Sequence, residues 1–251
     1  MSVSESDGLP LGGRIGVGRG VPRSRSSLVI AIDGPVGAGK STMARRLAET
    51  LGCVYVDSGA MYRALGWKAV RDGVDLTDHA RLAALGAATD IRLLPGTAGP
   101  RVLVDGNDMT DALRTPEIDQ AASLVSTCAA VRERLVALQR SMAARAGVVM
   151  DGRDIGTVVF PDADLKFFLD ADLSVRAERR RRDLERAGAP TTHAAVQEEV
   201  ARRDARDRTR EASPLSPAAD AIRIDSTSLC ADEVIRRMLA EVARLLKQDN
   251  S

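Results

Sequence analysis

The sequence predicts a three-layer α/β protein, with a doubly wound parallel sheet of about five strands between layers of helices. Two observations predict this class. Short apolar runs rich in β-branched residues, typical of buried strands, occur near residues 28, 53, 148, 165 and 221. Stretches with helical spacing of apolar residues separate most of these runs, and strands that alternate with helices pack into a parallel sheet. The 251 residues, 44% of them hydrophobic, suffice for one large domain.

The composition restricts the classes of function. The net charge is +1, so no general attraction to nucleic acid or membranes is expected. No apolar run approaches about 18 residues, so no membrane span is expected. Three widely separated cysteines, Cys53, Cys128 and Cys230, predict buried thiols in a reducing compartment rather than disulfides or a zinc site. With only His79 and His193, both in polar stretches, a histidine metal site or catalytic triad is not expected.

Residues 1–27 are expected to be disordered, because they are rich in glycine, arginine and serine and lack hydrophobic periodicity. The segment G-V-G-R-G at residues 16–20 has no strand before it and no helix after it, so we do not interpret it as a nucleotide loop. The segment also lacks the apolar core of a secretory signal. We therefore expect a single folded domain over residues 28–247.

The first strand, residues 28–32, runs into G-P-V-G-A-G-K-S at residues 34–41, and a helix follows. This is the P-loop pattern in the context that it requires. Its glycines let the backbone wrap closely around phosphate oxygens, and the helix N-terminus attracts negative charge. Lys40 is predicted to reach the β- and γ-phosphates, and the Ser41 hydroxyl to bind Mg²⁺ directly. The predicted triphosphate-binding residues are Gly34, Pro35, Val36, Gly37, Ala38, Gly39, Lys40, Ser41 and Thr42.

The second strand, residues 53–57, ends in D-S-G-A-M-Y-R at residues 57–63, where a helix begins. Ligands of doubly wound sheets collect beyond the carboxyl ends of the strands, so this polar cluster predicts a second ligand site. The alternative is a plain capped helix start, with Ser58 as the N-cap and Arg63 in solvent.

Residues 75–127 interrupt the alternation of strands and helices. The runs at 90–94 and 102–104 flank P-G-T-A-G-P, which predicts a small antiparallel hairpin, and Asp105-Gly106 is a further turn signal. Thr115 followed by Pro116 predicts an N-cap and the first residue of a helix. We interpret this region as an inserted subdomain.

A helix expected over residues 129–146 leads into a strand at 148–150, which ends in D-G-R-D-I-G at 151–156. Three apolar residues before an aspartate resemble a Walker B strand. Asp151 is therefore a candidate to hold Mg²⁺, directly or through water. Arg153 and Asp154 follow at the edge where the sheet presents residues to a ligand. Residues 165–169 form the next predicted strand.

The most charged part of the chain, residues 174–212, contains four consecutive arginines and R-R-D-A-R-D-R-T-R at 202–210. On a helix, Arg203, Asp207 and Arg210 share one face, with Arg206 beside them. Guanidinium groups with one carboxylate suit a phosphorylated ligand that carries hydroxyls. One alternative is a solvated helix with internal ion pairs. The other is nucleic-acid binding, which the interleaved acidic residues disfavour.

The last strand, residues 221–225, is followed by a C-terminal helix with a structural apolar stripe. None of the conspicuous polar residues is an obvious general base. A phosphate acceptor has a second pKa near 6 and is mostly dianionic at neutral pH, so it needs no base. The pattern therefore favours phosphoryl transfer to another phosphate, which depends on positioning and charge neutralisation. An arginine-rich mobile segment would close over the site and exclude water.

Four motifs together resemble the bacterial cytidylate kinases, and the resemblance extends over nearly all of residues 28–247. They are I-D-G-P at 32–35 leading into the P-loop, D-S-G-A-M-Y-R at 57–63, D-G-R-D-I-G-T-V-V-F-P at 151–161, and R-D-A-R-D-R at 203–208. The resemblance implies transfer of a phosphoryl group from ATP to CMP or dCMP, with Mg²⁺. It also implies a nucleoside-monophosphate-binding insertion at about 58–128 and a helical lid at about 178–212.

Carried over by motif position, the resemblance also assigns roles to single residues. It implies that Lys40, Arg153 and Arg210 are catalytic. It implies cytosine contacts from Ser123, Arg132 and Asp154, sugar contacts from Arg203 and Asp207, and phosphate or transfer-site contacts from Ser58, Arg63, Arg153 and Arg210. Asp154 can accept from the exocyclic amine of cytosine, and Arg132 can donate to its O2 and N3 edge. Uracil mismatches both groups.

The sequence disfavours other functions for a protein with a P-loop. A switch GTPase needs an Asn-Lys-x-Asp segment, and neither Asn107 nor Asn250 precedes a lysine. A kinase for shikimate or dephospho-coenzyme A would share the fold but lack the clusters at 57–63 and 151–156. We expect a cytoplasmic, monomeric enzyme whose partners are ATP and CMP or dCMP, without nucleic acid or membrane.

Overall fold

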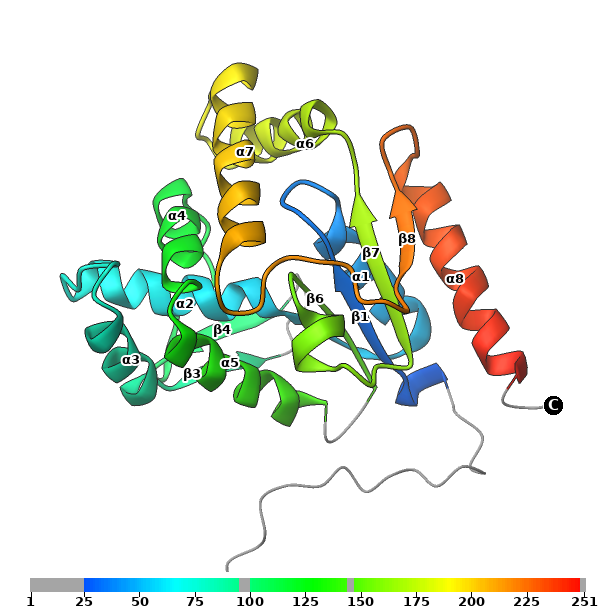
Figure 1. Ribbon diagram of the computed structural model, residues 1–251, viewed down its shortest axis with the longest axis horizontal. Coiled ribbons are helices and arrows are strands. Elements are labelled where there is room, and N and C mark those ends of the chain that lie inside the picture. Colours follow the sequence, from blue (N-terminus) through cyan, green and yellow to red (C-terminus); the bar gives the residue numbers. More distant parts are fainter. Residues whose placement is uncertain (1–24, 95–99, 144–146, 249–251) are drawn as a thin grey trace, which may run out of the picture.

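The computed structural model describes residues 25–94, 100–143 and 147–248. Its centre is a parallel sheet with the strand order β2-β6-β1-β7-β8 (Figure 1). All four pairings between neighbouring strands are parallel. The predicted fold class and the approximate strand number are therefore confirmed. The strands are β1 (Val29–Asp33), β2 (Val54–Asp57), β6 (Val148–Gly152), β7 (Leu165–Asp170) and β8 (Ile222–Asp225).

The alternation of side chains along β1 divides the core between two layers of helices. Ile30 and Ile32 pack with α1 (Lys40–Leu51) and α8 (Ala231–Gln248). Val29 and Ala31 point to the other face. There they join residues of α5 (Ala129–Met142) and of a π-helical turn, η2 (Ile155–Val159). Because both faces are covered, every residue of β1 is buried.

The insertion packs around a third hydrophobic core, to which Val131 and Leu135 of α5 also contribute. The insertion contains α2 (Ser58–Arg71), α3 (His79–Ala88), α4 (Pro116–Val125), and an antiparallel sheet of β3 (Ile91–Leu94), β4 (Arg101–Val104) and β5 (Asn107–Asp108). The hairpin is confirmed, but β5 was not predicted. Thr115 caps α4 by accepting from the amide of Ile118, as predicted.

Two helices, α6 (Leu173–Arg186) and α7 (His193–Thr209), form a hairpin beyond the carboxyl end of β7 (Figure 1). A small core of Ala177, Leu184, Val196 and Val200 holds them together. We call this pair the lid hairpin. Across the described ranges, no helix is long and apolar enough to cross a membrane.

Two expectations need correction. Residues 25–27 form a 3₁₀ turn, and the carbonyl of Ser26 accepts a hydrogen bond from the amide of Gly147. The expectation of disorder is therefore wrong for these three residues, while residues 1–24 lie outside the described part of the chain. The N-cap of α2 is Asp57, not Ser58, because the Asp57 carboxylate accepts from the amide of Ala60.

Candidate active site

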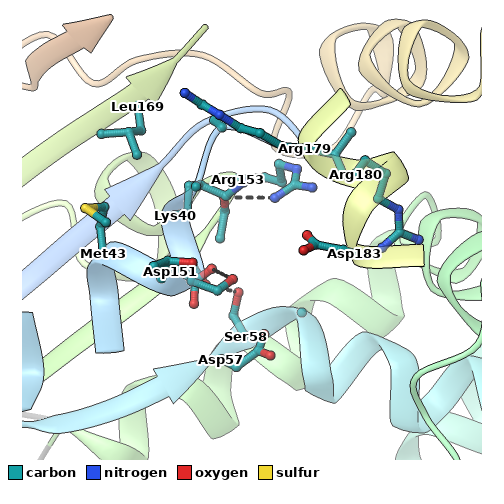
Figure 2. A pocket seen from close by; sticks show the side chains of 18 of the residues that line it. Lys40, Met43, Asp57, Ser58, Asp151, Arg153, Leu169, Arg179, Arg180 and Asp183 are labelled. Carbon is teal, nitrogen blue, oxygen red and sulfur yellow. Dashed lines mark hydrogen bonds between the residues drawn. The ribbon is translucent and has the colours of Figure 1, made fainter. Parts of the chain in front are cut away.

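A cavity of about 570 Å³ lies at the carboxyl ends of the central strands, between the P-loop, the insertion and the lid hairpin (Figure 2). Most of the predicted site residues line it. They are Val36, Gly37, Ala38, Gly39, Lys40, Ser41, Thr42, Ser58, Arg63, Ser123, Arg132, Asp151, Arg153, Asp154, Arg203, Asp207 and Arg210. Gly34 and Pro35 do not line the cavity.

Two glycines of the P-loop are required by close backbone approaches. Gly34 has φ +147°, and a Cβ there would lie 1.9 Å from the carbonyl oxygen of Leu169. Gly37 has φ +76°, and a Cβ there would lie 2.5 Å from the carbonyl oxygen of Arg176. Both contacts are to backbone atoms of neighbouring elements, so larger residues would displace the loop. Gly34 therefore shapes the loop from outside the cavity.

Lys40 is buried at the start of α1, and its ammonium group donates to the carbonyl of Pro35 over 2.7 Å. Burial, with a smaller contribution from the nearby charge of Arg153, lowers the pKa of Lys40 to about 7. A polyphosphate in the cavity would place negative charge beside this ammonium group and raise its pKa again.

Ser41 and Asp151 meet between α1 and β6. The Ser41 hydroxyl donates to the Asp151 carboxylate over 2.8 Å, and the Tyr55 hydroxyl donates to its other oxygen over 2.9 Å. Burial, followed by the charge of Asp57, raises the pKa of Asp151 to about 6. A hydroxyl and a carboxylate are the oxygen donors that Mg²⁺ prefers when phosphates and water complete its shell. The donor set therefore fits the predicted metal.

The cluster at 57–63 is held by internal contacts. Asp57 forms an ion pair with Arg63 over 2.7 Å, and this pairing contributes to lowering the pKa of Asp57 against the effect of burial. The Ser58 hydroxyl donates to the carbonyl of Asp151 over 2.6 Å. Arg63 is thus paired rather than solvated, so the alternative of a plain capped helix start is wrong in both details.

Asp33, at the end of β1, fixes the segment after β6. Its two carboxylate oxygens accept from the amides of Ile155 and Gly156 over 2.8 and 2.7 Å. Burial raises the pKa of Asp33 to about 6, although these two hydrogen bonds oppose the shift. The I-D-G-P segment before the P-loop includes this residue, but the sequence did not predict its role, because the amides that it binds lie more than 120 residues away.

Arg132 and Asp154 form a buried ion pair whose side chains are 4% and 7% exposed. The Arg210 guanidinium lies 3.9 Å from the other oxygen of Asp154. Arg132 also lies over the ring of Tyr62, 5.4 Å from its centroid. The sequence placed Tyr62 in the second cluster without giving it a role, and the structure adds it as a support for Arg132.

The lid hairpin contacts the insertion and the sheet through charged residues. Arg153 pairs with Asp207 over 2.9 Å, and Arg180 of α6 pairs with Asp119 of α4. Four guanidinium nitrogens are buried and have no hydrogen-bond partner among the described residues, namely Nε of Arg132, Arg180 and Arg203 and Nη2 of Arg210. All four residues line the cavity, and guanidinium groups suit an anionic, oxygen-rich ligand.

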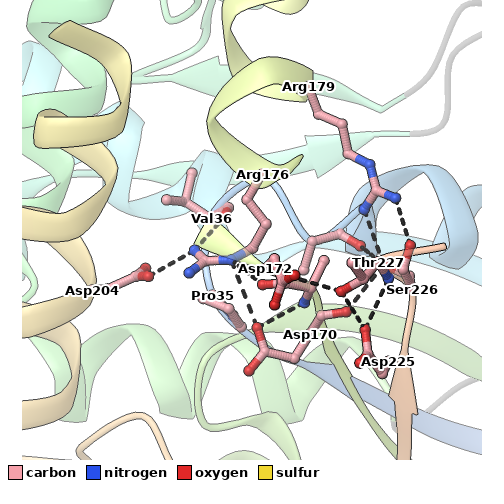
Figure 3. A network of polar contacts seen from close by, with 12 residues as sticks. Pro35, Val36, Asp170, Asp172, Arg176, Arg179, Asp204, Asp225, Ser226 and Thr227 are labelled. Carbon is pink, nitrogen blue, oxygen red and sulfur yellow. Dashed lines mark hydrogen bonds and ion pairs between the residues drawn. The ribbon is translucent and has the colours of Figure 1, made fainter. Parts of the chain in front are cut away.

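A second network ties the lid hairpin to the P-loop (Figure 3). Arg176 of α6 donates to the carbonyl of Val36 over 3.1 Å and pairs with Asp204 of α7 over 2.6 Å. Arg179 donates to the hydroxyl and carbonyl of Ser226. The sequence did not predict these residues, because a run of arginines does not indicate which of them face inward.

Comparison of the chain with known proteins identifies its family. A family model described as Cytidylate kinase matches residues 30–244. The chain is 51% identical to the cytidylate kinase of Pelotomaculum thermopropionicum over 85% of this chain and 95% of that protein. It is 46% identical to the cytidylate kinase of Bacillus subtilis over 86% and 96%. A gluconokinase structure from Sinorhizobium meliloti matches at 17% identity, with a TM-score of 0.48, over 90% of this chain and 97% of that one. The chain belongs to the cytidylate kinase family.

Proposed function

We propose that the protein transfers the γ-phosphoryl group of ATP to CMP or dCMP, giving ADP and CDP or dCDP. The observation that carries the proposal is that one cavity is lined both by the P-loop and by the Arg132–Asp154 pair. The P-loop suits a triphosphate donor, and a buried donor and acceptor side by side suit the edge of a base. A site for ATP alone would not need the buried Arg132–Asp154 pair.

The donor half comprises residues 34–42. Lys40 follows the γ-phosphoryl group as it moves, and its ammonium charge is restored by the phosphates around it. Ser41 and Asp151 would hold Mg²⁺, Ser41 directly and Asp151 through water or directly. The ion, when bound, neutralises phosphate charge during transfer. The Ser41 hydroxyl and the Asp151 carboxylate lie within hydrogen-bonding distance, 2.8 Å, so both oxygen groups are available at one place in the cavity.

The acceptor half is built from arginines and small polar groups. Arg153 and Arg210 act as catalytic residues, because they bring positive charge to the transfer site from β6 and from the end of α7. Ser58 and Arg63 bind the acceptor phosphate with them. Asp207 and Arg203, which both line the cavity, contact the sugar, where Asp207 accepts from a hydroxyl and Arg203 donates to one.

The base is read by Ser123, Arg132 and Asp154. The carboxylate of Asp154 accepts from the exocyclic amine of cytosine, and Arg132 donates to O2 and N3. Uracil presents a donor at N3 and lacks the amine, so it leaves buried groups unpaired. Such mismatches discriminate strongly, because unpaired buried polar groups are costly.

No general base is needed at the acceptor, because a phosphate monoester is already mostly ionised at neutral pH. The lid hairpin, corresponding to the proposed lid at about 178–212, excludes water that would otherwise take the phosphoryl group. Residues 58–128 form the proposed acceptor-binding insertion.

We further propose a cytoplasmic enzyme that works as a monomer, since one chain supplies every residue of the proposed site. Nucleic-acid binding is not favoured, because three arginines of α6 pair with carboxylates of their own helix. Arg181 and Arg182 both pair with Glu178, and Arg186 pairs with Asp183. This arrangement leaves little continuous basic surface for a phosphate backbone.

A coupled assay of ADP release tests the proposal, with CMP, dCMP, UMP, AMP and shikimate as acceptors. CMP and dCMP are expected to support high turnover and UMP low turnover. Higher activity on AMP or shikimate than on CMP would overturn the proposal.

A further inference from the structure

The buried Asp151 carboxylate is held through both of its oxygens. One oxygen accepts from the Ser41 hydroxyl over 2.8 Å, and the other accepts from the Tyr55 hydroxyl over 2.9 Å. A carboxylate is a rigid planar group, so a hydrogen bond that fixes one oxygen also fixes the direction in which the other points. The Tyr55 hydroxyl therefore helps to hold the Asp151 oxygen that faces Ser41.

Tyr55 reaches Asp151 from the neighbouring strand. In the register of β2 with β6, Tyr55 lies opposite Val149 and Asp57 lies opposite Asp151. Side chains alternate along a strand, so Tyr55 and Asp151 project from the same face of the sheet. The Tyr55 ring packs against the core that this face shares with α1, and the guanidinium of Arg45 lies over the ring, 5.8 Å from its centroid. Packing thus fixes the ring, and with it the position of the hydroxyl.

Tyr55 contacts both residues that we assign to Mg²⁺ without reaching the cavity itself. Ser41 and Asp151 line the cavity of about 570 Å³, but Tyr55 does not. Besides its hydrogen bond to Asp151, the Tyr55 hydroxyl interacts with the side chain of Ser41. A tyrosine hydroxyl carries its proton at neutral pH and can donate it to a carboxylate. Tyr55 is therefore placed to act on the cavity only through its neighbours.

We infer that Tyr55 is a positioning residue for Mg²⁺, because its hydroxyl holds the Asp151 carboxylate with one oxygen turned towards Ser41. The inference rests on the proposed function, in which Ser41 and Asp151 bind the ion. A hydrogen-bond partner behind a metal-binding carboxylate fixes its orientation, and losing such a partner lowers metal affinity by roughly 10- to 100-fold. Since Tyr55 does not line the cavity, it should affect ATP binding only when Mg²⁺ is present.

The test is calorimetric titration with ATP, without an acceptor, in buffer with Mg²⁺ and in buffer with EDTA. The readout is the ratio of the Kd in EDTA to the Kd in Mg²⁺. Tyr55→Phe keeps the ring, removes one oxygen and is expected to lower this ratio about tenfold, through a higher Kd in Mg²⁺ alone. Tyr62→Phe makes the same change at the other tyrosine of the chain, which lies against Arg132, and should leave the ratio unchanged.

A double-mutant cycle with Asp151→Ala completes the experiment, at a temperature where circular dichroism shows every variant folded. In the Asp151→Ala background, Tyr55→Phe should not lower the ratio further. An equal rise of both Kd values, or the same fall of the ratio with and without the carboxylate, would overturn the inference and assign Tyr55 to the fold.

The outcomes for the proposed function are separate. Should the ratio contradict the role of Tyr55 while the unmodified protein phosphorylates CMP, the proposed function stands. An unmodified protein that binds ATP equally well with and without Mg²⁺ would overturn the inference together with the metal assignment. Failure to phosphorylate CMP despite Mg²⁺-dependent ATP binding would overturn the proposed acceptor alone.

Discussion

Arg176 and Asp204 form an ion pair of 2.6 Å in which each side chain is only 5% exposed. Arg176 also donates to the carbonyl of Val36 in the P-loop. The pair therefore connects both helices of the lid hairpin to the loop that is proposed to bind the donor. One buried guanidinium therefore connects the lid hairpin to the P-loop, and we expect a shift of one to affect the other.

Asp204→Ala removes the partner of a buried charge and is expected to lower the free energy of unfolding by about 3 kcal/mol. It should also raise the KM for ATP more than the KM for CMP, because the P-loop contact depends on the same guanidinium. Denaturant unfolding and steady-state kinetics check both effects. Glu198→Ala on the same helix breaks only an exposed pair and should change little. Equal effects of the two substitutions would contradict the coupling.

Gly37→Ala and Gly188→Ala distinguish the cost of a strained backbone from the cost of a steric clash. Both glycines have φ +76°, but only at Gly37 would a Cβ meet another atom within 4 Å. Each substitution costs about 1 kcal/mol of left-handed strain. Gly37→Ala should also displace the P-loop and weaken ATP binding by roughly tenfold or more. Calorimetric titration with ATP measures this. Similar ATP affinities in the two variants would show that the loop tolerates the added atom.

ATP binding is expected to take up protons above pH 7. In the free protein the pKa of Lys40 is about 7, so at pH 8 the lysine is mostly neutral. Phosphates raise that pKa and restore the charge, with an uptake of up to about one proton per ATP. At pH 6 Lys40 is already charged and contributes no uptake. Calorimetry in buffers of different ionisation enthalpy measures the proton count. Lys40→Met should abolish the uptake at pH 8, and an unchanged count in this variant would assign it to another group.

Asp154→Ala should reduce kcat/KM far more for CMP than for UMP, because it removes the acceptor for the exocyclic amine of cytosine. It also leaves Arg132 buried without its partner, so a loss of stability of about 3 kcal/mol is expected alongside. Kinetics at a temperature where the variant stays folded isolates the first effect. An equal loss on both acceptors would assign Asp154 to the phosphate or to the fold.

The local motifs predicted most of the residues that line the cavity. Lys40 and Ser41 belong to a loop whose spacing, with a strand before and a helix after, is typical of phosphate-binding loops. Asp151 and Asp154 follow a short apolar strand, and such strand ends must meet at one edge of a parallel sheet. These features depend on near neighbours in sequence.

Features that depend on tertiary packing were missed. Asp119 and Arg180 are 61 residues apart, and nothing in the sequence around either one indicates the pairing. The strand β5 contains only two polar residues, so it has no hydrophobic pattern, and its pairing with β4 follows from the turn at Asp105-Gly106. Ser123 and Arg132 could be named only by resemblance, since their local sequence is unremarkable.

The most direct measurement of the central claim is a competition in one reaction. ATP labelled on the γ-phosphate is mixed with Mg²⁺ and equal concentrations of CMP, UMP and AMP, and the products are separated by chromatography. The account predicts that the label appears mainly in CDP, with little in UDP, ADP or inorganic phosphate. Label that accumulates chiefly in inorganic phosphate, ADP or UDP would contradict a closed site that delivers the phosphoryl group to a cytidine nucleotide.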